Sequence, residues 1–163
     1  MDNSQTENLL EESLELFEQH GGEIEEGLDT DDMELLQLRK ACRLLEAASF
    51  LEDENGYYTV IIEASFGAIE RTIQFYLLQT GLLHEDEYVT HDAVYERGFE
   101  AGLYGEKFKE KLTGLWRNNR SKTYYREGVG TEERAEVMLK IACSIHDYVL
   151  QLAGEKHECI CTD

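Results

Sequence analysis

The sequence predicts an all-α protein, an up-and-down four-helix bundle with an additional N-terminal helix. Three observations support this class. The 163 residues include no proline, the residue that most often ends or kinks a helix. Apolar residues recur at intervals of three and four, the period of an amphipathic helix. Segments that contain glycine separate these apolar stretches, and the length suits one domain with one core.

The first helix is expected from about Thr6 to Gln19, after the capping-box pattern Ser4-x-x-Glu7. Gly21-Gly22 ends this helix, and an acidic linker follows. Residues 1–38 contain 13 acidic residues and neither Lys nor Arg. We therefore expect residues 1–30 to form an acidic appendage, which either docks on the main body or covers a basic surface.

Two long antiparallel helices are expected next. The first runs from about Asp31 to Glu54, is capped by Asp29 or Thr30, and stops at Asn55-Gly56. The second runs from about Tyr57 to Thr80. Both carry apolar residues at helical spacing, so each is predicted to bury one face.

A third helix is expected to begin at His91-Asp92 after a cap at Thr90, and to continue through Trp116 into a basic stretch. Small residues gather on one of its faces. Interior glycine costs about 0.5 to 1 kcal/mol relative to alanine, so these residues either admit a very close neighbour or weaken the helix. They are Gly98, Ala101, Gly102 and Gly105.

The last helix is predicted to start at Thr131, because the following Glu132 and Glu133 complement the helix dipole. Its buried face is expected to comprise Ala135, Met138, Leu139, Ala142, Ile145 and Val149. The chain is thus divided into an N-terminal helix and linker (1–30), a helical body (31–154) and a C-terminal tail (155–163).

The charge balance limits the kinds of partner that the protein is expected to bind. Asp and Glu number 35 against 15 Lys and Arg, for a net charge of −20. This balance is similar to that of proteins from salt-loving archaea, and it opposes nonspecific nucleic-acid binding outside a local basic patch. No apolar run approaches the ~20 residues of a membrane span, and the N-terminus is acidic where a signal peptide is basic. We therefore expect a cytoplasmic protein with no membrane partner.

One stretch is basic, residues 107–126, with seven Lys or Arg against one Glu. Its donors and aromatic rings suit phosphate, ribose or a nucleobase. The alternative is that the stretch pairs with the protein's own carboxylates. The candidate phosphate-binding or nucleotide-binding residues are Arg117, Asn118, Arg120, Lys122, Tyr124 and Tyr125.

The four cysteines do not show the paired spacing of a zinc site. Cys42 and Cys143 lie in apolar helical stretches and are predicted to be small buried residues. Cys159 and Cys161 lie close to a chain terminus, and the alternative for them is that they bind a soft metal. We therefore expect neither a metal nor a cofactor.

The order of these elements resembles the HEPN domain family over about Asp31 to Leu152: two long helices, a third helix with glycines, an Arg-rich segment with tyrosines, and a last helix. Active members carry Arg, usually a polar residue, then His after four to six residues. Here Arg117-Asn118 matches the start of that motif, and Lys122 stands where the His would fall, with Tyr124 two residues on.

Two further matches belong to this resemblance. Arg120 and Tyr125 fit a variant of the motif with Arg, four residues and Tyr. Glu70-x3-Gln74 is similar to the polar pair that the family places on an early helix, and its alternative is an exposed polar stripe. The family implies a helical fold, pairing of two copies near the Arg residues, and in active members a metal-independent ribonuclease.

The missing histidine decides which function is expected. In the nucleases His moves protons while Arg holds the phosphate, and lysine with a pKa near 10.4 does not replace it near neutral pH. His91 and His146 are expected to be a helix-start residue and a satisfied core residue. Lys122 and Tyr124, with Arg117, stay candidates for a catalytic role only in the second of the functions below.

The first expected function is a noncatalytic HEPN-like module that binds a nucleotide or RNA phosphate, or pairs with a nucleotidyltransferase. The second is a metal-independent, toxin-like ribonuclease, which would use Arg117 or Arg120 with Tyr124, Lys122 or a histidine from a dimer partner. The third is a structural or regulatory helical protein. A homodimer with Arg117 and Arg120 near its interface is expected.

Overall fold

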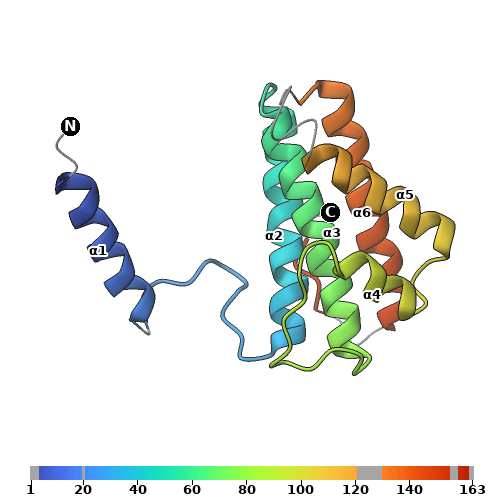
Figure 1. The fold of residues 1–163 in the computed structure, drawn as a ribbon, viewed down its shortest axis with the longest axis horizontal. Coiled ribbons are helices and arrows are strands. Elements are labelled where there is room, and N and C mark those ends of the chain that lie inside the picture. The colour runs from blue at the N-terminus through green and yellow to red at the C-terminus, as the bar shows by residue number, and fades with distance from the viewer. Residues whose placement is uncertain (1–3, 20, 121–129, 155–157, 162–163) are drawn as a thin grey trace.

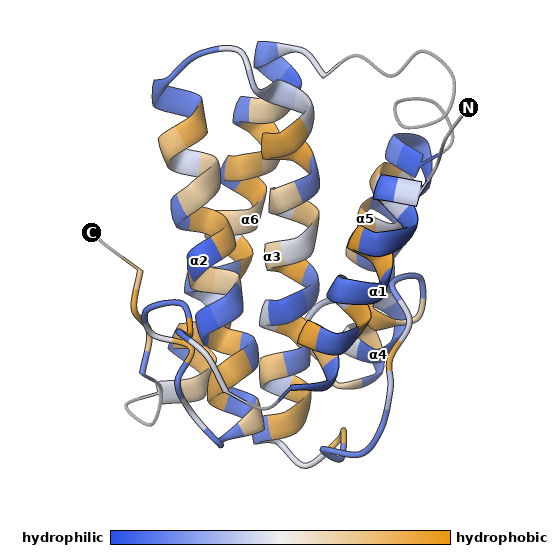
Figure 2. Cartoon of the chain, turned by 90° about the vertical axis from the view of Figure 1, so that its left-hand side faces the viewer, coloured by the Kyte–Doolittle hydropathy of each residue, from blue (hydrophilic) through white to orange (hydrophobic). Residues whose placement is uncertain are grey.

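The computed structural model describes residues 4–19, 21–120, 130–154 and 158–161. These residues form six α-helices and no strand, so the predicted all-α fold with an additional N-terminal helix is confirmed. Figure 1 shows three long helices, α2, α3 and α6, side by side, with α5 lying obliquely across them. Figure 2 shows apolar and polar residues alternating along these helices, as expected of helices that each bury one face.

The long antiparallel pair consists of α2 (Met33–Asp53) and α3 (Tyr58–Gln79). The cap of α2 differs from the prediction: it is Asp32, whose side chain accepts hydrogen bonds from the backbone N–H groups of Glu34 and Leu35 at 3.0 and 3.1 Å. The predicted turn at Asn55-Gly56 is confirmed, since both residues have positive φ, 57° and 116°.

The third helix differs from the prediction because it is split in two. A short helix, α4 (Val94–Glu100), begins three residues later than expected, and α5 (Glu106–Asn118) follows after a break. Gly102 lies in that break with φ of 76°, a conformation that a continuous helix excludes. The residues from Ala101 to Gly105 thus mark the break between α4 and α5. Gly98 has the other predicted role, because it lets neighbouring side chains approach closely. A Cβ at position 98 would collide with the Tyr104 hydroxyl and lie 3.2 Å from Ile73 Cγ2.

The last helix, α6 (Glu132–Ala153), has its predicted cap at Thr131, whose side chain accepts from the Arg134 N–H. All six residues of its predicted inner face are buried. They pack against α3 and α2 around a core that also contains Leu38, Ile69 and Phe75. Just before this helix, the Gly130 N–H donates to Thr59 Oγ1 at 3.1 Å, which fixes the start of α6 beside the start of α3.

The N-terminal helix α1 (Ser4–Glu18) contains no buried residue, and Figure 1 shows it apart from the bundle. The linker after it does contact α2: Arg43 Nε donates to Glu25 at 2.7 Å, and Arg39 Nη1 donates to the Gly27 carbonyl at 3.2 Å. Among the described residues, the acidic leader therefore reaches cations of α2. That residues 1–30 also cover the basic stretch stays a prediction.

No helix in the described part of the chain is both long enough and apolar enough to cross a membrane.

Candidate functional site

Two carboxylates of α3, Glu63 and Glu70, define the polar surface that faces α4 and α5. They are seven residues apart, which places them on the same side of the helix. Glu63 meets the end of α5, and Glu70 meets the segment that leads into α4. The sequence pattern singled out Glu70 and Gln74 on this helix, so the structure adds Glu63 to the site.

Glu70 is a buried acid, only 5% exposed, so the alternative of an exposed polar stripe is wrong for this residue. Its carboxylate accepts a hydrogen bond from the Tyr95 hydroxyl at 3.1 Å and pairs with His91 Nδ1. A buried carboxylate is costly unless such partners satisfy it. Burial and the neighbouring Glu70 charge both raise the pKa of Tyr95, which keeps this hydroxyl a neutral donor.

His91 differs from Glu70 in its access to solvent, since 59% of its side chain is exposed. Because Nδ1 faces Glu70, Nε2 is the nitrogen that a ligand can reach. An imidazole oriented by a buried carboxylate is the arrangement that enzymes use for a general base. The sequence predicted His91 to be a helix-start residue. Its pairing with Glu70 could not be predicted, because 21 residues separate the two and no motif links them.

The end of α5 carries three of the predicted site residues. Asn119, which the sequence did not single out, donates from Nδ2 to Glu63 Oε1 at 2.6 Å. Arg120 lies 3.8 Å from Glu63 and above the ring of Trp116, which itself contacts Tyr95. A continuous series of contacts therefore links the two acids of α3. It runs from Glu63 through Arg120, Trp116 and Tyr95 to Glu70.

Arg117 and Asn118 are exposed at the end of α5. The pKa of Asp92 is lowered, chiefly by a hydrogen bond from Thr90 and its own backbone, and further by the charge of Arg117. The charge of Arg117 thus acts on the turn that carries Asp92 and His91. The alternative that the basic stretch pairs with the protein's own carboxylates is realised at Arg120 and also at Lys109, which lies 3.0 Å from Glu96.

Gln74 lies away from the end of α5. Its side-chain oxygen accepts from Arg71 Nη1 at 3.1 Å, and the same nitrogen donates to Gln37 at 3.0 Å. Gln74, Glu70 and His91 line a hollow of about 220 Å³ beside the connection between α3 and α4. The predicted polar pair therefore belongs to this hollow. Lys122, Tyr124 and Tyr125 lie outside the described residues.

A groove of about 550 Å³ opens between α3, α5 and α6, at the end of α5 that carries Asn118. Its walls are largely apolar, while its polar groups are two amides, one carboxylate and one guanidinium. The lining residues are Ile62, Phe66, Leu115, Asn118, Asn119, Glu133, Arg134, Val137, Met138 and Ile141. The predicted residue Asn118 thus lines a cavity of the size that small ligands occupy.

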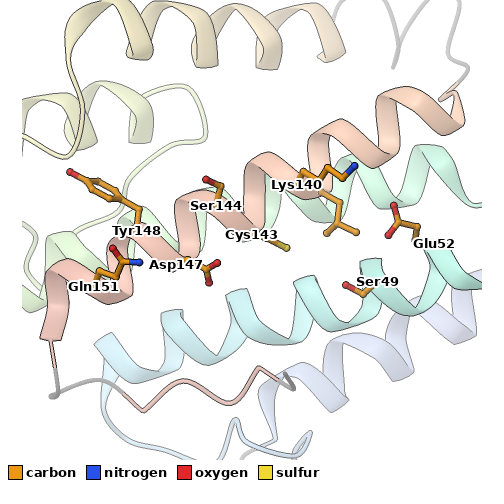
Figure 3. Close-up of a pocket in the computed structure, with 9 residues that line it drawn as sticks. Ser49, Glu52, Lys140, Cys143, Ser144, Asp147, Tyr148 and Gln151 are labelled. Atoms are coloured by element: carbon orange, nitrogen blue, oxygen red, sulfur yellow. The ribbon is translucent and has the colours of Figure 1, made fainter.

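A second groove, of about 630 Å³, lies between α2 and α6 and contains none of the predicted site residues. Figure 3 shows Cys143 on α6 in this groove, with Ser49 and Glu52 on the opposite helix. Burial, and then the charges of Asp147 and Glu52, raise the pKa of the Cys143 thiol. Such a thiol is a poor nucleophile, since the thiolate is the reactive form.

The other three cysteines lie together with a histidine, which the spacing of the cysteines did not predict. The side chains of Cys42, His146, Cys159 and Cys161 place one donor atom each within 4.8 Å of the others. Cys42 and His146 are buried as expected. A pattern in which the ligands come from three distant parts of the chain is invisible to a search for paired cysteines.

Comparison with known proteins shows the family but not an activity. No curated protein and no solved structure matched the chain. A family model did match, over residues 1–161, and so covers α1, the linker, the bundle and most of the tail. The chain therefore belongs to the family described as a domain of unknown function, DUF8154.

Proposed function

We propose that this protein is a noncatalytic, HEPN-like helical module that binds a nucleotide or an RNA phosphate at the end of α5. One observation carries the proposal: a groove of about 550 Å³ with largely apolar walls opens between α3, α5 and α6, and both Asn118 and Arg134 line it. Ligand pockets commonly have volumes of about 300 to 1,000 Å³, mostly apolar walls and a few polar groups.

The chemistry of the groove suits the parts of a nucleotide. Apolar walls accept the face of a base, and the Asn118 amide offers both a donor and an acceptor to its edge. Guanidinium groups hold phosphate oxygens through two parallel hydrogen bonds. Asn119 has another task in this proposal, because its bond to Glu63 holds the end of α5 in place.

The test is equilibrium binding of a labelled RNA oligonucleotide and of free nucleotides at a fixed high concentration of potassium chloride. Arg117→Ala should weaken binding by about 1.5 to 3 kcal/mol, the usual contribution of a charged hydrogen bond. The matched control is Lys140→Ala, which removes the same charge from the exposed side of α6 beside the other groove. Equal affinities of the two variants would refute the proposed site.

A second candidate function, a metal-independent ribonuclease, is favoured by the pair of Glu70 and His91. In this mechanism His91 Nε2 would take the proton of a ribose 2′-hydroxyl, whose oxygen attacks the adjacent phosphorus while the 5′-oxygen leaves and takes a proton from water. Arg117, whose charge acts on Asp92 of the same turn, would hold the phosphate. The His91 of this chain would then serve in place of the motif histidine that is absent at Lys122.

RNA cleavage in the presence of a chelator separates the two functions. Cleavage that is lost in His91→Ala and reduced in Glu70→Gln would establish the ribonuclease and overturn the noncatalytic proposal. RNA binding without cleavage supports the first proposal. The HEPN resemblance further implies a homodimer and a nucleotidyltransferase partner, which belong to the proposal as its expected assembly.

A further inference from the structure

Four metal-binding side chains converge on one point from three separate parts of the chain. Cys42 lies on α2, His146 on α6, and Cys159 and Cys161 on the tail after α6. Figures 1 and 2 show this tail on the α2 side of the bundle. His146 is 2% exposed and Cys42 is 1% exposed, so solvent does not reach the cluster from the side of the core.

The distances within the cluster match the edges of a zinc tetrahedron. Bonds of about 2.3 Å to sulfur and about 2.0 Å to nitrogen give edges of about 3.8 Å between sulfurs and about 3.5 Å between sulfur and nitrogen. The Sγ atoms of Cys42 and Cys159 are 3.5 Å apart. His146 Nε2 lies 3.7, 3.6 and 3.4 Å from the Sγ atoms of Cys42, Cys159 and Cys161.

These sulfur atoms do not form a disulfide. The separation of 3.5 Å between Cys42 and Cys159 far exceeds the ~2.05 Å of an S–S bond, and all four cysteines are free. The backbone N–H of Cys161 also donates to Cys159 Sγ at 3.4 Å. A donor directed at the sulfur favours its thiolate form, which is the form that binds a metal.

The histidine is oriented for the same role. Its Nδ1 lies 3.1 Å from Thr72 Oγ1, a fully buried hydroxyl on α3. With Nδ1–H donating to this oxygen, the lone pair of Nε2 is directed at the three sulfurs. Histidines that bind metals are usually held by such a hydrogen bond from the other ring nitrogen.

We propose that Cys42, His146, Cys159 and Cys161 bind one zinc ion in a structural, tetrahedral centre. Three thiolates and one imidazole in this geometry select zinc among common divalent ions. All four positions are filled by the protein, whereas a catalytic zinc keeps one position open. The ion would fasten the tail to α2 and α6.

The experiment measures the metal itself. The full-length protein, kept reduced, is loaded with zinc chloride, freed of excess ion by gel filtration and analysed by mass spectrometry of its metals. We expect equimolar zinc in the parent protein and in the control variant Cys143→Ser, whose sulfur lies in the other groove. We expect loss of zinc in Cys159→Ser and Cys161→Ser. Both substitutions fall in the half-buried tail, so circular dichroism should show an intact bundle.

Two further measurements give independent readouts. Cobalt in place of zinc should give the thiolate charge-transfer and intense visible bands of a tetrahedral sulfur site, weakened in Cys161→Ser. Thr72→Val should lower the zinc affinity, measured against a competing chelator, by about 10- to 100-fold, the usual effect of losing a partner of a metal-bound histidine. Absence of stoichiometric zinc, or equal zinc in the tail variants and the parent, would overturn the proposal.

Discussion

Replacing Tyr95 by Phe tests whether the buried acid Glu70 depends on its hydrogen bonds. The change removes one hydroxyl from a fully buried ring and leaves the ring's packing against Trp116 in place. The lost bond, 3.1 Å long, ends on a carboxylate that is itself 5% exposed. A hydrogen bond to a charged group contributes about 1.5 to 3 kcal/mol, so the free energy of unfolding should fall by about that amount.

Tyr104→Phe is the matched control. Its hydroxyl donates to the Tyr95 carbonyl at 2.9 Å, a bond between neutral groups that contributes about 0.5 to 1.5 kcal/mol. The assay is unfolding by denaturant, followed by circular dichroism at fixed salt, with the slope of the transition checked for constancy. In thermal unfolding, each kcal/mol should lower Tm by about 2 to 4 °C for a chain of this size. A loss in Tyr95→Phe no larger than in Tyr104→Phe would refute the assignment of Glu70 as a charged acceptor.

Three other predictions concern packing, chemistry and assembly. Gly98→Ala should destabilise the protein by about 1 to 3 kcal/mol, because the new methyl group collides with Tyr104. Gly114→Ala should stabilise it by about 0.5 to 1 kcal/mol, because nothing lies within 4 Å of the added Cβ. Unfolding by denaturant measures both changes. Lys122→His restores the Arg-x4-His spacing and supplies a group with a pKa near 6.5, so it should give RNA cleavage that the parent lacks, in a gel assay with chelator. Light scattering in molar potassium chloride should show a dimer, and a monomer of 18.8 kDa would contradict that expectation.

The helical elements could be predicted because their signals are local. The inner face of α6, from Ala135 to Val149, follows from spacing alone, and its cap at Thr131 from one residue type. The split of the third helix could not be predicted with the same ease. Gly102 signals a break only if its positive φ is known, and the same glycine is compatible with close helix packing.

The site was less accessible to prediction because its contacts join distant parts of the chain. Glu70 was identified through a resemblance, but its partner His91 was not, since nothing in the spacing of the two residues links them. The cysteine cluster shows the same limit. Cys42 precedes Cys159 by 117 residues, and the two meet only because the tail lies against α2 in the folded chain.

Arg39 gives the two ends of the chain a common anchor on α2. Its guanidinium donates to the Gly27 carbonyl of the N-terminal linker and, at 2.5 Å, to Glu158 of the tail. Ile160 of the tail also packs against Gly27. Shortening the chain before Glu158 would therefore remove Ile160 from the linker and also remove Glu158 from the Arg39 guanidinium that holds the linker. Limited proteolysis should then cut near Gly27 as well as in the tail, so a truncation made at one end would be felt at the other.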